Sequence, residues 1–232
     1  MIDMTYCKYL FLIVCLYSSA LHAEKLKVVP SLDLHFATWT GEDVGGGGTY
    51  TSGSVMKTLG VMLQKDRWYS GLLLKSGNFK FEGVVPEQNT GLVIDPSEIG
   101  HGDFDLIAGY YLWNRVSLFV DLKSTSMEWI DNNYVVAFGG VGFGISGYYP
   151  LKASVLYSSF GLVSLVSTVD KVEVGTGGGS SFEFGWMKKL SASISLKIGV
   201  KSQTQVIDFT ANEQQQNHIG GLVIGLNRAF TL

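Results

Sequence analysis

A stretch near the end of the chain, residues 191–201, alternates strictly between polar and apolar side chains and restricts the possible folds more than any other feature. It reads SASISLKIGVK. One face carries serines, lysines and a glycine, and the other carries Ala192, Ile194, Leu196, Ile198 and Val200. Because successive side chains of a strand point to opposite faces, the pattern predicts a β-strand with one apolar face. Its length of about ten residues suits a tilted strand that crosses a bilayer.

Similar alternation recurs along the chain and predicts ten strands. They lie near 31–40, 53–64, 67–82, 102–113, 115–125, 133–149, 151–165, 179–188, 190–204 and 217–231. Short turns are predicted at Lys65–Asp66, Asn114, Pro150 and Lys188–Lys189, and long polar loops at 41–52, 83–101, 126–132, 166–178 and 205–216. Short turns at one end and longer loops at the other are typical of an all-β, antiparallel, up-and-down transmembrane barrel. Eight or twelve strands are the alternatives.

Aromatic residues gather at the predicted ends of the strands. Those beside the short turns are Trp68, Tyr69, Trp113, Tyr148, Tyr149 and Trp186. Those near the long loops are Trp39, Tyr50, Trp129 and Tyr134. Aromatic side chains with one polar end favour the boundary between membrane and water, so the two groups predict two aromatic belts.

The N-terminal segment, residues 1–23, has the features of a cleavable export signal, and residues 24–232 are expected to form the barrel. An apolar core at 9–17 follows Lys8, and small residues follow the core. Both cysteines, Cys7 and Cys15, lie in this segment, so the barrel has no disulfide and no thiolate metal site. The net charge of −3 shows no basic excess for a nucleic-acid partner. We expect no metal and no cofactor.

Alternation alone does not decide which face of each strand points inward. A soluble barrel would place the apolar set inside and the polar set in water. Here the polar set is rich in glycine and serine with few charges of mixed sign, the apolar set ends in aromatic residues, and the connections differ between the two ends. These features favour the transmembrane arrangement, in which the apolar set contacts lipid.

The end of the chain, residues 225–232, reads GLNRAFTL and resembles the C-terminal strand of bacterial outer-membrane β-barrel proteins. Phe230 and Leu232 match the terminal alternation of the signal that such proteins present to the barrel assembly machinery, although the last residue there is often Phe. The runs 109–123 and 144–151 also resemble hairpins of small porin-like barrels. The resemblance implies a bacterial outer-membrane location, with outer-membrane lipid and the assembly machinery as partners.

Charged residues on the predicted polar faces suggest what fills the lumen. They are Asp33, Lys75, Asp103, Asp105, Asp121, Lys123, Glu183, Lys197 and Lys201. A charge in a narrow barrel needs a partner or water, and the mixed signs predict ion pairs that fill the interior. We therefore expect a non-enzymatic barrel, either structural or a narrow porin-like channel for small polar solutes.

Two further functions remain open. His101, Asp103 and Asp105 lie close together in the sequence, and a histidine beside carboxylates is a candidate general base. At the external rim these residues are weak candidates for catalysis on envelope lipid, since ordinary polar residues at a hydrated rim explain them as well and no G-x-S-x-G motif accompanies them. The long loops also permit an adhesin or ligand binder. Conductance in a planar bilayer, beside a lipid-hydrolysis assay, separates these functions.

Overall fold

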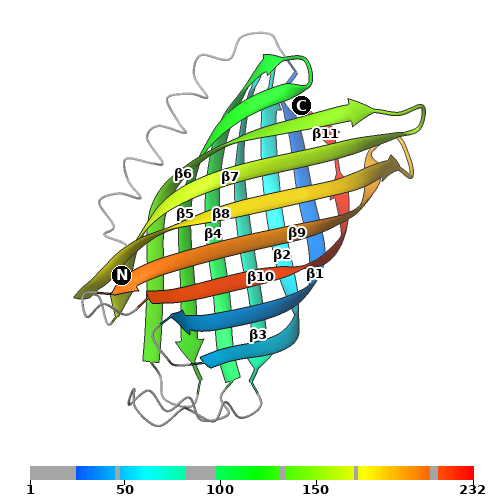
Figure 1. Cartoon of the computed structure of the whole chain (residues 1–232). Coiled ribbons are helices and arrows are strands. Elements are labelled where there is room, and N and C mark those ends of the chain that lie inside the picture. Colours follow the sequence, from blue (N-terminus) through cyan, green and yellow to red (C-terminus); the bar gives the residue numbers. More distant parts are fainter. Residues whose placement is uncertain (1–24, 45–47, 82–97, 131–133, 170–171, 210–213) are drawn as a thin grey trace.

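The computed structural model describes residues 25–44, 48–81, 98–130, 134–169, 172–209 and 214–232. The predicted export signal lies outside these residues. The long strands wind around one tilted cylinder (Figure 1). Each strand pairs antiparallel with its neighbours in sequence, and β10 pairs with β1 to close the barrel. The strands are β1 (Lys27–Val44), β2 (Gly48–Lys65), β3 (Trp68–Lys80), β4 (Glu98–Trp113), β5 (Val116–Trp129), β6 (Tyr134–Pro150), β7 (Ser154–Val169), β8 (Val172–Lys189), β9 (Ile194–Phe209), β10 (Gln214–Arg228) and the short β11 (Phe230–Thr231).

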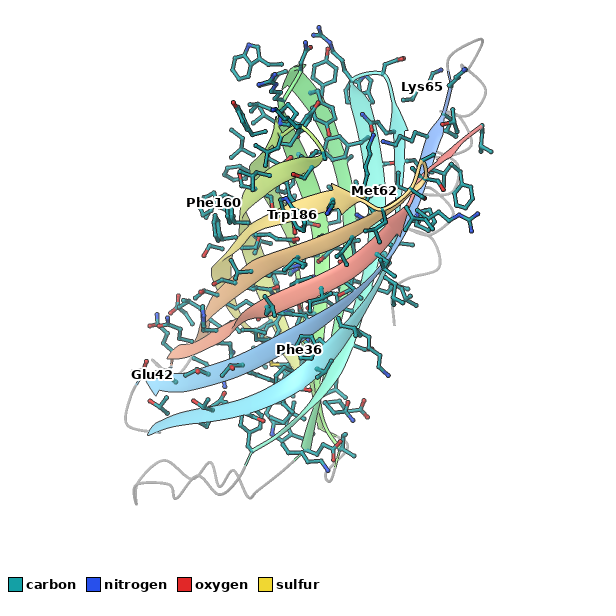
Figure 2. All side chains as sticks on the ribbon, turned by 90° about the vertical axis from the view of Figure 1, so that its right-hand side faces the viewer. Phe36, Glu42, Met62, Lys65, Phe160 and Trp186 are labelled. Carbon is teal, nitrogen blue, oxygen red and sulfur yellow. The ribbon has the colours of Figure 1, made fainter. Side chains whose placement is uncertain are left out.

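The predicted fold class and the count of ten barrel strands are confirmed. β11 is an addition that pairs with the start of β1, where Val28 lies opposite Phe230. The short turns gather at one end of the barrel, here called the turn end, and the other connections gather at the loop end. In Figure 2, Lys65 marks the turn end and Glu42 marks the loop end. Among the described residues, none lies in a helix long and apolar enough to cross a membrane.

The strands reach further toward the loop end than predicted. Most of the residues predicted as loops at 41–52, 126–132, 166–178 and 205–216 belong to strands, and β4 begins at Glu98 rather than beyond 101. At the turn end, the predicted turn at Lys188–Lys189 belongs to β8, and the chain reverses over 190–193 instead. The loop-end segments were mistaken for loops because their outward side chains are polar, which lowers the average hydropathy without breaking the alternation.

The outer surface has an apolar band that covers only the turn-end part of the barrel. On β5, Leu118, Val120 and Leu122 are 47%, 51% and 42% exposed, whereas Ser126 and Glu128 follow them on the same face. The band continues onto neighbouring strands, since exposed Leu222 lies opposite Phe36 on one side and opposite Val200 on the other, and both of these are exposed as well. An exposed apolar band of this kind faces lipid in transmembrane barrels. We call the part inside the band the membrane section and the part beyond it the loop-side section.

The inner face of the barrel changes from polar to apolar near the level where the outer face changes from apolar to polar. In the membrane section β5 turns Asp121 and Lys123 inward, and in the loop-side section its inward residue is Met127. β3 likewise changes from inward Lys75 to inward Phe79. Apolar residues therefore point outward in the membrane section and inward beyond it, so the loop-side section is built like a soluble barrel.

Buried apolar side chains fill this loop-side section, and every barrel strand except β8 contributes to them among the described residues. We call the group the loop-side core: Ala37, Trp39, Tyr50, Met56, Phe79, Phe81, Ile99, Met127, Val136, Phe138, Leu165, Ile207 and Ile219.

The prediction of a second aromatic belt near the long loops is wrong. Trp39 and Tyr50 point into the loop-side core, and Trp129 packs against it. The side chain of Tyr134 lies outside the described part. At the turn end, Trp68, Trp113, Tyr148 and Tyr149 are exposed, as a membrane-boundary belt requires. Trp186 is half-buried. Tyr69 does not belong to the belt, because its hydroxyl lies 3.0 Å from that of Ser117 inside the barrel.

The band predicts how two arginine substitutions on one face of β5 will differ. We expect Val120→Arg to destabilise the folded barrel by about 2–4 kcal/mol, since it places a charge near the middle of the lipid band. Ser126→Arg, on the same face but beyond the band, should change stability by less than about 1 kcal/mol. Urea titration of both variants in lipid vesicles measures the difference. Equal losses would show that the band ends elsewhere.

Candidate functional site

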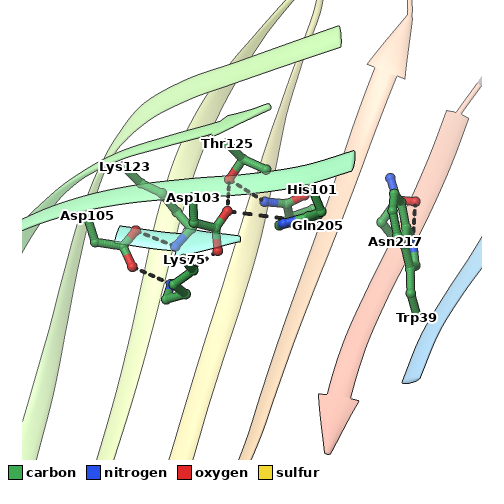
Figure 3. Close-up of polar contacts among 9 residues, drawn as sticks. All are labelled: Trp39, Lys75, His101, Asp103, Asp105, Lys123, Thr125, Gln205 and Asn217. Atoms are coloured by element: carbon green, nitrogen blue, oxygen red, sulfur yellow. Dashed lines mark hydrogen bonds and ion pairs between the residues drawn. The ribbon is translucent and has the colours of Figure 1, made fainter. Parts of the chain in front are cut away.

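Four charged residues from three neighbouring strands form one network inside the barrel, close to the boundary between the two sections (Figure 3). Lys75 Nζ lies 3.1 Å from Asp103 Oδ2 and 2.5 Å from Asp105 Oδ2. Lys123 Nζ lies 2.6 Å from the other oxygen of Asp105, and Thr125 donates to Asp103 Oδ1 at 2.6 Å. All five residues are buried. The network carries two positive and two negative charges, so it is neutral as a unit.

Strand register explains why these residues meet. Lys75 on β3 lies directly opposite Asp103 on β4, and Asp105 lies opposite Lys123 on β5. Residues that face each other in an antiparallel pair have neighbouring side chains on the same side of the sheet. Each charge thus finds its partner on the adjacent strand.

Contacts also cross the lumen from strands that are not neighbours. Gln205 on β9 donates its Nε2 to the Thr125 hydroxyl on β5 at 3.5 Å. The ring of Trp39 on β1 meets the ring of His101 on β4 edge-on, with centroids 5.6 Å apart, and its Nε1 donates to Asn217 Oδ1 at 3.1 Å. Side chains from opposite walls therefore touch at this height, as Gln205 and Thr125 do in Figure 3.

His101 does not lie at the external rim, where an enzyme acting on lipid would need it. It is 2% exposed and is enclosed by the rings of Trp39 and Phe79. Its Nε2 is 4.0 Å from Asp103 Oδ1, and neither ring nitrogen has a hydrogen-bond partner in the described structure. Asp103 and Asp105 are held by lysines in the network. The position at the start of β4 suggested a rim site, but β4 begins three residues earlier and turns His101 inward.

A second cluster lies nearer the turn end. Lys197 Nζ lies 2.6 Å from Asp33 Oδ2 and 3.3 Å from Glu183 Oε1, and the Tyr157 hydroxyl donates to Glu183 at 3.0 Å. Gly225 stands between Asp33 and Lys197 in the register, and a Cβ there would collide with Asp33 Oδ1. The missing side chain at Gly225 therefore lets an ion pair form across an intervening strand.

A cavity of about 300 Å³ lies beside this cluster, inside the membrane section. Its deep end includes His35, Lys75 and Lys201, and its other end, near the turns, includes Met62 and Met187. His35 and Lys75 are buried, whereas the two methionines are partly exposed. The cavity is therefore more accessible at the turn end than at the end nearer the loop-side core.

The remaining predicted residues lie apart from these clusters. Asp121 is on the inner face of β5, and its Oδ1 is buried without a hydrogen-bond partner in the described part. Phe230 and Leu232 are exposed at the turn end, beside the start of β1. Among the described residues, no group of three or more His, Cys, Asp or Glu is arranged to hold a metal ion. The loop-side core was not predicted, although the shift of apolar residues from one alternating set to the other is visible in the sequence.

No protein-family model and no curated protein matches the sequence. Solved structures do match. The outer membrane protease OmpT from Escherichia coli has a TM-score of 0.57 at 11% identity, over 89% of this chain and 97% of that chain. An outer membrane channel from Pseudomonas putida F1 has a TM-score of 0.47 at 13% identity, over 90% and 97%. The beta domain of the Bordetella autotransporter BrkA has 0.45 at 11%, over 90% and 100%. The fold is that of bacterial outer-membrane β-barrels.

Proposed function

We propose that this outer-membrane β-barrel is non-enzymatic and closed to the passage of solutes along its axis. The observation that carries the proposal is the loop-side core, which spans the lumen from one wall to the other. Trp39, Phe79, Phe138 and Ile207 in it are at most 1% exposed. A porin needs a continuous wet path between its two ends, and a dry, close-packed layer interrupts that path.

The other functions have less support from the geometry. A narrow channel would use the charges in the membrane section, but the path stops where Met127 and Phe79 replace Lys123 and Lys75 on the inner face. An enzyme at the rim would need an accessible base, and His101 is enclosed. A binder or adhesin would use loop-end connections, the longest of which, 82–97, lies outside the described residues.

Conductance in a planar bilayer tests the closed lumen. The wild-type protein should give no steady openings. We expect the double variant Trp39→Ala, Phe79→Ala to give them, because it removes two large rings from the middle of the loop-side core. Folding of the variant is checked by its shift on gels before and after boiling.

A matched control removes the same two residue types from the outer surface. Trp113 and Phe143 are each 65% exposed, so the double variant Trp113→Ala, Phe143→Ala should stay silent in the bilayer. Stable, ion-selective openings from the wild-type protein would refute the closed barrel and favour the narrow channel.

A further inference from the structure

The cavity in the membrane section is lined by a lysine that forms no salt bridge and a histidine with an unpaired ring nitrogen, among the described residues. Lys201 lines the cavity and has no carboxylate oxygen within 4.0 Å among the described residues, unlike the lysines of both clusters. His35 is 6% exposed, lines the same cavity, and its Nε2 has no hydrogen-bond partner in the described part. Within the described part of the chain, an ammonium group without a salt bridge and a ring nitrogen without a hydrogen bond therefore line one space.

The nearby carboxylates of the second cluster form close ion pairs with Lys197 and not with Lys201. Glu183 lies directly opposite Lys201 in the register of β8 and β9, yet its side chain binds Lys197 and Tyr157 instead. Asp33, the other carboxylate of that cluster, also binds Lys197. Lys201 is only partly exposed, and an ammonium group with reduced access to water is stabilised by an anion beside it. The cavity therefore presents an open position for an anion at its deep end.

The walls between that position and the turns are partly apolar. Val29, Met62, Leu73, Met187 and Val223 contribute to them. A volume near 300 Å³ is at the lower end for small-molecule sites, which combine apolar walls with a few polar groups. Methionine side chains also adapt readily to an apolar ligand. A bare inorganic anion would leave these walls without contacts.

We propose that the cavity binds a small amphipathic anion, a medium-chain aliphatic carboxylate, with its headgroup on Lys201 and His35 and its chain along the apolar wall toward the turns. Because the loop-side core closes the other end, the ligand enters from the turn end. The site itself rests on the cavity and its unpartnered groups, and only the direction of entry rests on the closed lumen. A conducting wild-type barrel would thus refute the proposed function and leave the site to be judged by binding.

Calorimetric titration with octanoate tests the site, using the full barrel folded in micelles and a titration of micelles alone as the blank. We expect saturable binding to the wild-type protein. Lys201→Met should weaken it at least tenfold, equivalent to about 1.4 kcal/mol, because the headgroup loses its charge partner. Lys201→Gln serves the same purpose if the methionine variant does not fold. Ser159→Phe, which narrows the cavity, should weaken binding while leaving Lys201 in place.

Two comparisons separate the parts of the proposal. Lys57→Met removes an exposed lysine from the outer face of β2 and should leave octanoate affinity unchanged. Acetate, which has the same headgroup without the chain, should bind at least tenfold more weakly than octanoate. The proposal is wrong if wild-type protein shows no saturable binding, or if Lys201→Met binds octanoate as tightly as wild type. Equal affinity for acetate and octanoate would overturn the amphipathic ligand class.

Discussion

Met127→Lys is expected to destabilise the barrel by about 3–5 kcal/mol, because it places an unpaired charge in a dry, close-packed layer. Met127 is 1% exposed and belongs to the loop-side core. In a barrel whose lumen is wet from end to end, an inward lysine would meet water and cost little. The substitution therefore distinguishes the soluble-type interior of the loop-side section from a porin-type lumen.

The adjacent residue provides a matched control for this substitution. Ser126 precedes Met127 on β5, points outward and is exposed. Ser126→Lys should change the free energy of unfolding by no more than about 0.5 kcal/mol, as ordinary surface substitutions do. Urea or guanidinium titration, followed by the shift between folded and boiled protein on gels, measures both variants. Similar stabilities for the two lysine variants would mean that the loop-side core is hydrated.

The sequence alone was sufficient to predict the strands of the membrane section and their two faces, because two constraints act on these strands together. Lipid requires an apolar outer face, and the strand geometry returns a side chain to that face at every second residue. Val120 and Leu122 alternate with Asp121 and Lys123 in the sequence, and the structure exposes the first pair on the outside. Ten such segments, joined by short turns at one end, led to the correct fold class and strand count.

The apolar interior of the loop-side section was not predicted because the apolar side chains change from the outer face to the inner face within a single strand. On β1, the apolar set passes from Leu34 and Phe36 on the outside to Ala37 and Trp39 on the inside. The predicted strand at 31–40 spans this change, but a search for one continuous apolar phase does not recognise Ala37 and Trp39 as an inward-facing set. Trp39 was then placed in a membrane-boundary belt, since aromatic residues at strand ends usually lie there.

The partners of the lumen charges could not be predicted, although the residues themselves were identified. Alternation gives the face of a residue but not the register of its strand against the next. Lys75 meets Asp103 and Asp105 only because β3 and β4 pair with Leu74 opposite Phe104. The contact of Gln205 with Thr125 depends further on the width of the barrel, which no local pattern encodes.

The second large effect is expected from the charge network. Lys75→Met should destabilise the barrel by about 3–5 kcal/mol, because removing one partner of a buried ion pair leaves the other charge uncompensated. Among the side chains that the structure describes, Asp103 then keeps the Thr125 hydroxyl as its only hydrogen-bond donor, whereas Asp105 retains Lys123. The free energy of unfolding from urea titration in vesicles gives the size of the loss.

The same strand offers an exposed counterpart. Lys80 is on β3 with Lys75, and its Nζ lies 3.5 Å from Glu98 Oε2, but the lysine side chain is 78% exposed. Lys80→Met should cost no more than about 1 kcal/mol, since water screens such a pair. The double variant Lys75→Met, Asp103→Asn should recover much of the loss, because it removes the stranded charge together with its partner. If the double variant is as unstable as the sum of its single variants, Lys75 acts through packing rather than through the ion pair.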